Sequence, residues 1–345
     1  MENLRSGLSI STHAGCSLQC SYCILDVLDF DTSKPQQIAN VESIENKLFR
    51  EGSDFLSMKP PLLVNNRTDP FLPQVAPATY EVLDMLARNK VETPVILITK
   101  LAPNFNLDSY SEKLNLMVFY TFSGLDRPIE TRTASAALRF IDRFTSNVPF
   151  ASRYHYFRPI ISGLNDNEDS IRWVLNTVSS KFRASVVSGL RILPSIKQKL
   201  EAHGIMLGGY RMGHKTLFED TLLRVWKLRD EIAPDYVVFR HTSCAIFAHL
   251  GKPDHLGWRT AKKLACDPKC SQRALCMNFS PFINDTLVDY IKRHTRAKFV
   301  LDGDTIIFDD PVEQELISSI KLNSGAKVKT KELIYSPSES EFLHA

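Results

Sequence analysis

The feature that most constrains the fold is an alternation of short apolar runs with longer amphipathic segments. Seven runs have the length and composition of strands, at residues 7–11, 61–66, 94–99, 116–121, 153–160, 185–193 and 235–241. Helices are predicted between them, for example at 79–90, 134–144 and 170–180. This alternation favours βα units around a parallel sheet. We therefore predict an α/β fold, a partial (β/α)6, TIM-like barrel.

The chain is long enough for such a barrel and a smaller appendage, because 43% of its 345 residues are hydrophobic. The composition changes after about residue 242, where Gly, Pro, Lys and His accumulate with a second group of cysteines. We expect the barrel over residues 1–241 and a C-terminal, cysteine-rich extension over 242–345. Neither a signal peptide nor a membrane-spanning run is recognisable, so we expect a cytoplasmic protein without a membrane partner.

Six of the seven cysteines form two triplets, which in a reducing compartment indicates metal or redox chemistry. Cys16, Cys20 and Cys23 make a CxxxCxxC pattern directly after the first predicted strand, at the end where barrels carry their active sites. Three thiolates can hold three irons of a [4Fe–4S] cubane and leave the fourth iron open. A structural zinc site is the alternative, with His13 as a fourth ligand.

This triplet, with the aromatic Tyr22 before its last cysteine, resembles the signature of radical S-adenosylmethionine (SAM) enzymes. The resemblance covers about residues 5–195. Further segments follow in the order of the spore photoproduct lyase-like branch, which includes DNA repair photolyase-like proteins: "NNRTDPFLP" at 65–73, "LITK" at 97–100, "YTFSGLD" at 120–126, "ETR" at 130–132 and "RPIISGLND" at 158–166.

The resemblance implies a radical SAM barrel whose open iron binds the amino and carboxylate groups of SAM. An electron from the reduced cluster then breaks a carbon–sulfur bond of SAM, and the resulting 5′-deoxyadenosyl radical abstracts a hydrogen atom from the substrate. A reductant such as flavodoxin or ferredoxin is the implied partner.

The resemblance also implies a set of cofactor-binding residues at the ends of the predicted strands. Asn66, Thr68 and Asp69 take the place where other members bind the amino group of SAM, and Lys100 is placed to pair with its carboxylate. The remaining members are Tyr22, Thr121, Ser123 and Arg158.

Each of these residues also has a structural alternative. Thr-Asp-Pro is often only a turn in which the aspartate caps the local backbone. A lysine after an apolar run usually extends to solvent, as Lys100 would. Thr121 and Ser123 could be ordinary strand-end hydroxyls, and Arg158 could pair with Glu130 or Asp166.

One departure from the branch concerns the substrate. Spore photoproduct lyase uses a cysteine near the end of its second strand as a hydrogen-atom donor, whereas this chain has Asn65 and Asn66 there. No cysteine lies between Cys23 and Cys244. Thymine-dimer reversal by that mechanism is therefore not expected, and fold-level kinship does not supply the substrate.

A second cysteine group lies in the extension and comprises Cys244, Cys266, Cys270 and Cys276. Four thiolates can close a metal site, and we expect an auxiliary [4Fe–4S] cluster. A zinc site and metal-free thiols are the alternatives. His241, His249 and His255 are alternative fourth ligands if Cys244 is merely buried.

The segment 252–273 carries six Lys or Arg residues against two Asp, with Trp258 among them. This pattern is compatible with phosphate contacts and base stacking, although solvated loop charges would look the same. The substrate is therefore either nucleic acid or, because C-terminal auxiliary clusters resemble those of peptide-modifying members, a peptide or protein. A non-catalytic zinc- or cluster-binding protein is the competing class.

Overall fold

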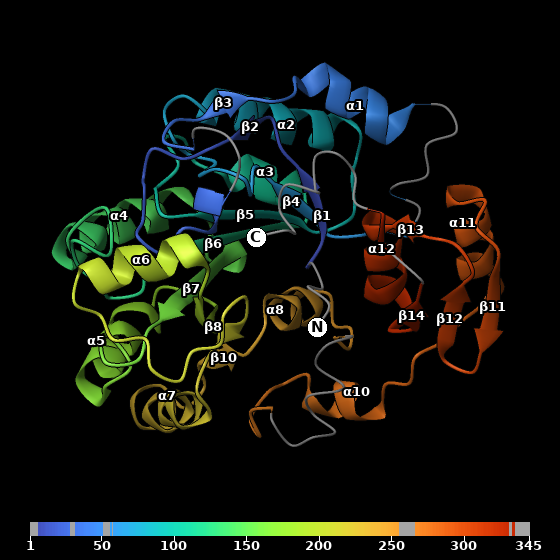
Figure 1. The fold of residues 1–345 in the computed structure, drawn as a ribbon. Coiled ribbons are helices and arrows are strands. Elements are labelled where there is room, and N and C mark those ends of the chain that lie inside the picture. The colour runs from blue at the N-terminus through green and yellow to red at the C-terminus, as the bar shows by residue number, and fades with distance from the viewer. Residues whose placement is uncertain are drawn as a thin grey trace.

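A parallel sheet forms the centre of the molecule, in the strand order β1-β4-β5-β6-β7-β8-β10 (Figure 1). The computed structural model describes residues 6–27, 32–50, 56, 58–254, 266–330 and 333–334. The strands are β1 (Leu8–Ile10), β4 (Leu62–Val64), β5 (Val95–Thr99), β6 (Leu116–Thr121), β7 (Arg153–Ile160), β8 (Ala184–Arg191) and β10 (Val237–Phe239). All seven predicted strands are present and pair in parallel with their neighbours, which confirms the α/β, partial-barrel prediction.

Helices connect these strands on the outer face of the sheet. They are α1 (Val41–Phe49), α2 (Ala76–Arg88), α3 (Asp108–Lys113), α4 (Ala134–Asn147), α5 (Glu168–Val178), α6 (Pro194–Ala202) and α7 (Glu219–Ile232), with short 3-10 turns η1 (Ile24–Val27) and η2 (Phe150–Ser152). Thr133 and Asn167 begin α4 and α5, because each side chain accepts a hydrogen bond from a backbone N–H of the first turn. None of the described helices is long and apolar enough to cross a membrane.

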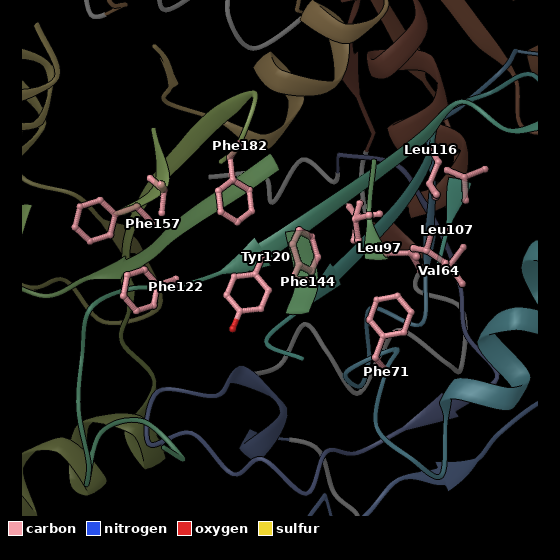
Figure 2. Packing of buried hydrophobic residues seen from close by; sticks show 14 of the residues in the cluster. Val64, Phe71, Leu97, Leu107, Leu116, Tyr120, Phe122, Phe144, Phe157 and Phe182 are labelled. Carbon is pink, nitrogen blue, oxygen red and sulfur yellow. The ribbon is translucent and has the colours of Figure 1, made fainter. Parts of the chain in front are cut away.

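The two faces of the sheet bury different sets of side chains, because successive residues of a strand point to opposite sides. On the outer face, Val64, Leu97 and Tyr120 pack with Phe144 of α4 and with Phe182 (Figure 2). This cluster extends along the sheet and is the largest part of the core. Because a second cluster covers the other face, the strands β4, β5 and β6 are apolar at nearly every position.

The inner face of the sheet is covered by α8 (Thr242–His249). Ala245 and Ile246 of this helix are fully buried, in one cluster with Ile96, Phe119 and Tyr156 of the sheet. The helix therefore belongs to the barrel core by its packing, although it begins the predicted extension. The boundary near residue 241 stays a prediction.

A second, smaller unit follows and has a core of its own. After the short helix α10 (Arg273–Asn278), this unit comprises α11 (Asp285–His294), α12 (Gln314–Ser324) and the sheet β11-β12-β14, formed by Phe299–Asp302, Thr305–Phe308 and Lys327–Lys329. β13 (Val312–Glu313) pairs with β15 (Leu333–Ile334). Leu287, Ile306 and Ile320 lie in the centre of this unit. Figure 1 shows it in orange and red, on the side of the molecule away from α4 and α5.

Candidate active site

A cavity opens where the strands β4 to β8 end, and the predicted site residues converge on it. Its lining includes Cys16, Cys20, Tyr22, Cys23, Asn66, Thr68, Asp69, Lys100, Thr121 and Arg158. Ser123 instead lines an adjoining recess that it shares with Lys100 and Glu130. Residues separated by more than a hundred positions therefore share one wall, because parallel strands bring their C-terminal ends to the same edge.

Backbone contacts fix the cysteine loop against the rest of the barrel. The Gly15 N–H donates to the Arg67 carbonyl at 3.0 Å, and the Cys16 N–H donates to the Thr32 carbonyl at 2.8 Å. Gly15 has φ +88°, and a Cβ there would lie 2.3 Å from the Lys34 carbonyl oxygen. Only glycine fits this position. The loop is further held by β2 (His13–Ala14), which pairs with β3 (Gln36–Gln37).

The three thiols of this loop all line the cavity. Burial raises the pKa of Cys16 and Cys20 to about 11, so these thiols stay protonated at neutral pH unless a metal replaces the proton. Within the described part of the chain, no group of three His, Cys, Asp or Glu residues could hold a single metal ion. A cubane carries its irons at separate corners, so its thiolates need not converge on one point.

His13 does not line the cavity; its Nδ1 lies 2.9 Å from the Thr12 hydroxyl.

The turn after β4 holds the cavity wall in place. Asn65, buried and with φ +51°, accepts a hydrogen bond from the Thr12 N–H at 2.8 Å and donates to the Thr79 hydroxyl at 2.8 Å. Asp69 accepts from the Lys100 N–H at 2.6 Å and from the Thr99 hydroxyl at 2.8 Å. Both carboxylate oxygens of Asp69 are therefore engaged in fixing the turn to β5. The sequence analysis did not assign Asn65 this structural role, although an asparagine at the end of an apolar run is a signal for such a turn.

Thr68 carries a polar atom that the described protein leaves unsatisfied. Its hydroxyl is buried and has no hydrogen-bond partner among the described residues, and the residue lines the cavity. A buried polar group without a partner costs about 1–3 kcal/mol. The position thus suits a polar ligand. Asn66 beside it is exposed and donates to the Ser9 hydroxyl at 3.0 Å.

Glu130 is the centre of a polar cluster at the edge of the cavity. The Lys100 ammonium lies 2.7 and 2.8 Å from its two carboxylate oxygens, and both side chains are largely buried, at 18% and 9% exposure. Tyr22 hydrogen-bonds to Glu130 and to Lys100. Ser123 donates to the same carboxylate at 3.1 Å. Lys100 therefore does not extend to solvent, and Tyr22 links the cysteine loop to β5.

The electrostatics of this cluster keep Lys100 charged. Burial by itself lowers the pKa of Lys100, but Cys20, when its thiol is ionised, and the negative charge of Glu130 raise it, and the net shift is upward. Glu130 was considered from the sequence only as a partner of Arg158. Its central position could not be read from the sequence, because it depends on how the loop after β6 folds back to the cysteine loop.

Arg158 pairs with neither of the acids considered for it. Glu130 is bound to Lys100, and the Asp166 carboxylate accepts from the Gly163 N–H at 2.9 Å. The Arg158 guanidinium lies 5.9 Å from the centre of the Tyr156 ring. It lines the cavity together with Arg191 and Lys215, two cations that the sequence analysis did not single out.

The second cysteine group is also gathered in space. Cys244 is buried on α8, with its Sγ 3.5 Å from an oxygen of Asp254, whose backbone N–H donates to Cys276 Sγ at 3.4 Å. A hydrogen bond between Cys266 and Cys270 lowers the pKa of the first and raises that of the second. Asp254 is buried among these thiols and was counted from the sequence only as a charge.

The histidines and basic residues considered for this region have defined partners where the structure describes them. His249 hydrogen-bonds to the Tyr154 hydroxyl at 2.9 Å and to Asn115. His241 precedes α8, and burial, with the charges of Arg240 and Lys215, lowers its pKa to about 4. Lys269 pairs with Asp230 at 2.9 Å, and Arg273 donates to the Cys266 carbonyl at 2.7 Å. His255, Trp258 and three basic residues of the segment lie outside the described residues.

The fold and the cavity define an α/β partial-barrel protein with three cysteines at the mouth of the sheet. No protein-family model and no curated protein matches the chain. Among solved structures, a cysteine-to-serine mutant of spore photoproduct lyase matches with a TM-score of 0.47 and 10% identity, over 69% of this chain and 79% of that one. Another mutant of that lyase, with bound AdoMet and dinucleoside spore photoproduct, matches with a TM-score of 0.46 and 11% identity, over 67% of this chain and 75% of that one.

SuiB from Streptococcus suis, bound to S-adenosylmethionine, matches with a TM-score of 0.44 and 12% identity, over 71% of this chain and 52% of that one. At identities of 10–12%, these similarities concern the fold alone.

Proposed function

We propose that the protein is a radical SAM enzyme in which Cys16, Cys20 and Cys23 hold a [4Fe–4S] cluster. The observation that carries this proposal is that the CxxxCxxC loop lines the same cavity as Thr68, Lys100 and the other polar strand ends. When bound, the cluster and SAM would supply a 5′-deoxyadenosyl radical for hydrogen abstraction from the substrate. A reductant such as flavodoxin or ferredoxin would deliver the electron.

The side chains of this cavity would then bind and orient SAM. The buried hydroxyl of Thr68 is available to hydrogen-bond a polar group of the ligand, with Asn66 and Thr121 on the same wall. Asp69 acts through the turn, because both of its oxygens already bind protein groups. Ser123 acts from the adjoining recess through Glu130.

Lys100 has two possible partners in this proposal. In the structure it is bound to Glu130, which also holds Tyr22 next to two of the cysteines. Binding of the SAM carboxylate would require Lys100 to share or exchange that partner. We propose that it does so, since a charge-assisted bond to a carboxylate offsets the loss of a similar one.

We further propose an auxiliary [4Fe–4S] cluster at Cys244, Cys266, Cys270 and Cys276. The support is that hydrogen bonds and mutual charge effects connect these thiols through Asp254 and through each other. Zinc in this second site is the alternative. The substrate is proposed to be nucleic acid, as the resemblance of the strand-end segments suggests, with a peptide as the second candidate.

Anaerobic reconstitution tests the proposal. About eight irons per chain are expected for two cubanes and about four for one. Incubation with dithionite and SAM should give 5′-deoxyadenosine, measured by mass spectrometry. Replacing Cys16, Cys20 and Cys23 by Ala should abolish this product, whereas the Cys266→Ala/Cys270→Ala variant should lose about half of its iron and keep uncoupled SAM cleavage at least in part.

A chain that takes up only zinc, or a triple variant that still forms 5′-deoxyadenosine, would contradict the proposal. The first outcome would favour the non-catalytic binding protein instead.

A further inference from the structure

Three cations line one side of the cavity. Arg158 comes from β7, Arg191 from β8, and Lys215 from β9 (Lys215–Thr216), a short strand that pairs antiparallel with β8. The register puts Lys215 directly opposite Arg191. Neither Arg158 nor Lys215 forms an ion pair with an acidic residue in the described part of the chain.

The three cations repel one another. Arg158 is the largest cause of a lowered pKa of Lys215, which falls to about 7, with burial and Arg191 contributing after it. The pKa of Arg191 is also lowered, first by burial and then by Arg158. Lys215 is exposed to solvent, so repulsion by the two arginines, rather than burial, is the main reason for its lowered pKa. Like charges held this close destabilise the free protein unless an anion joins them.

We infer that Arg158, Arg191 and Lys215 form a subsite for a phosphate group of the substrate. This inference rests on the proposed function only in assigning the phosphate to a substrate. Guanidinium groups bind phosphate oxygens in pairs, whereas a lysine adds a point charge. A phosphate monoester carries close to two negative charges at neutral pH. It therefore balances this cluster better than a single carboxylate does.

The subsite lies in the same cavity as the cysteine loop. A phosphate bound there would place the attached part of the substrate next to the proposed SAM site. The phosphate comes either from a terminal monoester, as in a nucleotide, or from the diester backbone of a nucleic acid, and both present the same oxygens to the three cations.

Titration calorimetry on the anaerobically reconstituted protein tests the subsite. Inorganic phosphate should bind both with and without saturating SAM, and acetate should bind at least about tenfold more weakly. Arg191→Gln and Lys215→Gln should each weaken phosphate binding about tenfold, with the dissociation constant of SAM unchanged within about twofold. Arg211→Gln is the matched control, because Arg211 is exposed in the same β8–β9 connection and does not line the cavity.

Two single-stranded DNA decamers, with and without a 5′-phosphate, separate the sources of phosphate. Equal affinities that both fall in Lys215→Gln assign the subsite to the diester backbone, and a preference for the phosphorylated strand assigns it to a terminal monoester.

Unchanged phosphate affinity in Arg191→Gln and Lys215→Gln would overturn the inference. So would a loss of SAM affinity in these variants together with competition between SAM and phosphate, because the cations would then serve the SAM carboxylate. Phosphate binding in a protein that binds no SAM would refute the proposed function and leave the anion subsite standing.

Discussion

His155 is a fully buried histidine held in one tautomer by its neighbours. Its Nε2–H donates to the Phe122 carbonyl at 2.8 Å, which leaves Nδ1 to accept from the Ser185 hydroxyl at 2.7 Å. Tyr236 donates in turn to Ser185, at 2.8 Å. Burial lowers the pKa of His155 to about 4. The residue therefore links β6, β7 and β8 as a neutral group.

This burial predicts a pH dependence of stability. The unfolded chain protonates His155 near pH 6.5 and the folded chain only near 4, so stability is complete above pH 6.5 and falls as the pH drops toward 4. His155 alone should cost about 1 kcal/mol between pH 7.5 and 5.5. His241 and His249, whose pKa values are also lowered to about 4, act in the same direction.

Urea unfolding of the metal-free chain at both pH values measures this loss. His155→Gln should reduce the difference by about 1 kcal/mol, and an identical difference in that variant would show that His155 is not the titrating group.

If Lys100 binds SAM as proposed, substitutions of Lys100 and of its partner Glu130 should affect SAM binding differently. Lys100→Ala should weaken SAM affinity by about 1.5–3 kcal/mol, the range for hydrogen bonds to charged groups. Glu130→Gln should not weaken it, because it removes the competing carboxylate and leaves a hydrogen-bond acceptor for Tyr22 and Ser123. Equilibrium binding of SAM to the reconstituted variants checks this. An equal loss of SAM affinity in Lys100→Ala and Glu130→Gln would mean that the ion pair only stabilises the position of the cysteine loop.

At the scale of elements, the position of β9 depends on the close approach of two backbones. A Cβ at Gly189 in β8 would lie 1.6 Å from the carbonyl oxygen of Thr216 in β9. No side chain can occupy that space, so β9 can lie against β8 only because residue 189 is glycine. This contact brings Lys215 to the cavity.

Gly189→Ala should therefore displace β9 and lower the free energy of unfolding by about 1–3 kcal/mol, the usual cost of overpacking. Phosphate affinity should fall to the level of Lys215→Gln. Gly208→Ala is the control, since a Cβ at Gly208 in the same connection would meet nothing within 4 Å. Wild-type phosphate affinity in Gly189→Ala would argue against the role given to β9.

At the scale of the whole molecule, a buried ion pair joins the barrel to the second cysteine group. The Arg229 guanidinium on α7 lies 2.9 Å from the Asp267 carboxylate, and the two side chains are 2% and 5% exposed. Arg229 also donates to the Tyr236 carbonyl at 3.0 Å. Asp267 lies between Cys266 and Cys270 in the chain. The pair thus ties the proposed auxiliary site to the outer helices.

Asp267→Ala should destabilise the protein by about 1.5–3 kcal/mol, the range for a hydrogen bond to a charged group, because it removes one acidic partner of the buried Arg229 while the ion pair with Asp230, at 2.7 Å, remains. Iron at the second site should fall while 5′-deoxyadenosine formation at the first site persists. Chemical unfolding and iron analysis measure both effects. Asp304→Ala, which removes an exposed pair with Lys327, should cost less than about 1 kcal/mol. Equal stability losses in the two variants would contradict this role.

The strands and main helices of the barrel were determined by the sequence alone. Runs such as 94–99 and 116–121 are apolar at nearly every position because both faces of the sheet are covered, by the outer helices on one side and α8 on the other. The cysteine triplet after β1 could likewise be placed at the mouth of the sheet, because the C-terminal ends of parallel strands share one edge. These inferences depend on local periodicity and on a general rule of topology.

Only the tertiary structure decided which polar groups meet. Glu130 pairs with Lys100 rather than with Arg158. The Asp69 carboxylate binds the Thr99 hydroxyl and the Lys100 N–H at the end of β5. The helix α8 packs against the inner face of the sheet, although it begins the cysteine-rich segment. Lys215 reaches the cavity through a two-residue strand with no sequence signature of its own. Such contacts join residues far apart in the chain, and their partners are selected by distance and burial in the folded state, which no local pattern encodes.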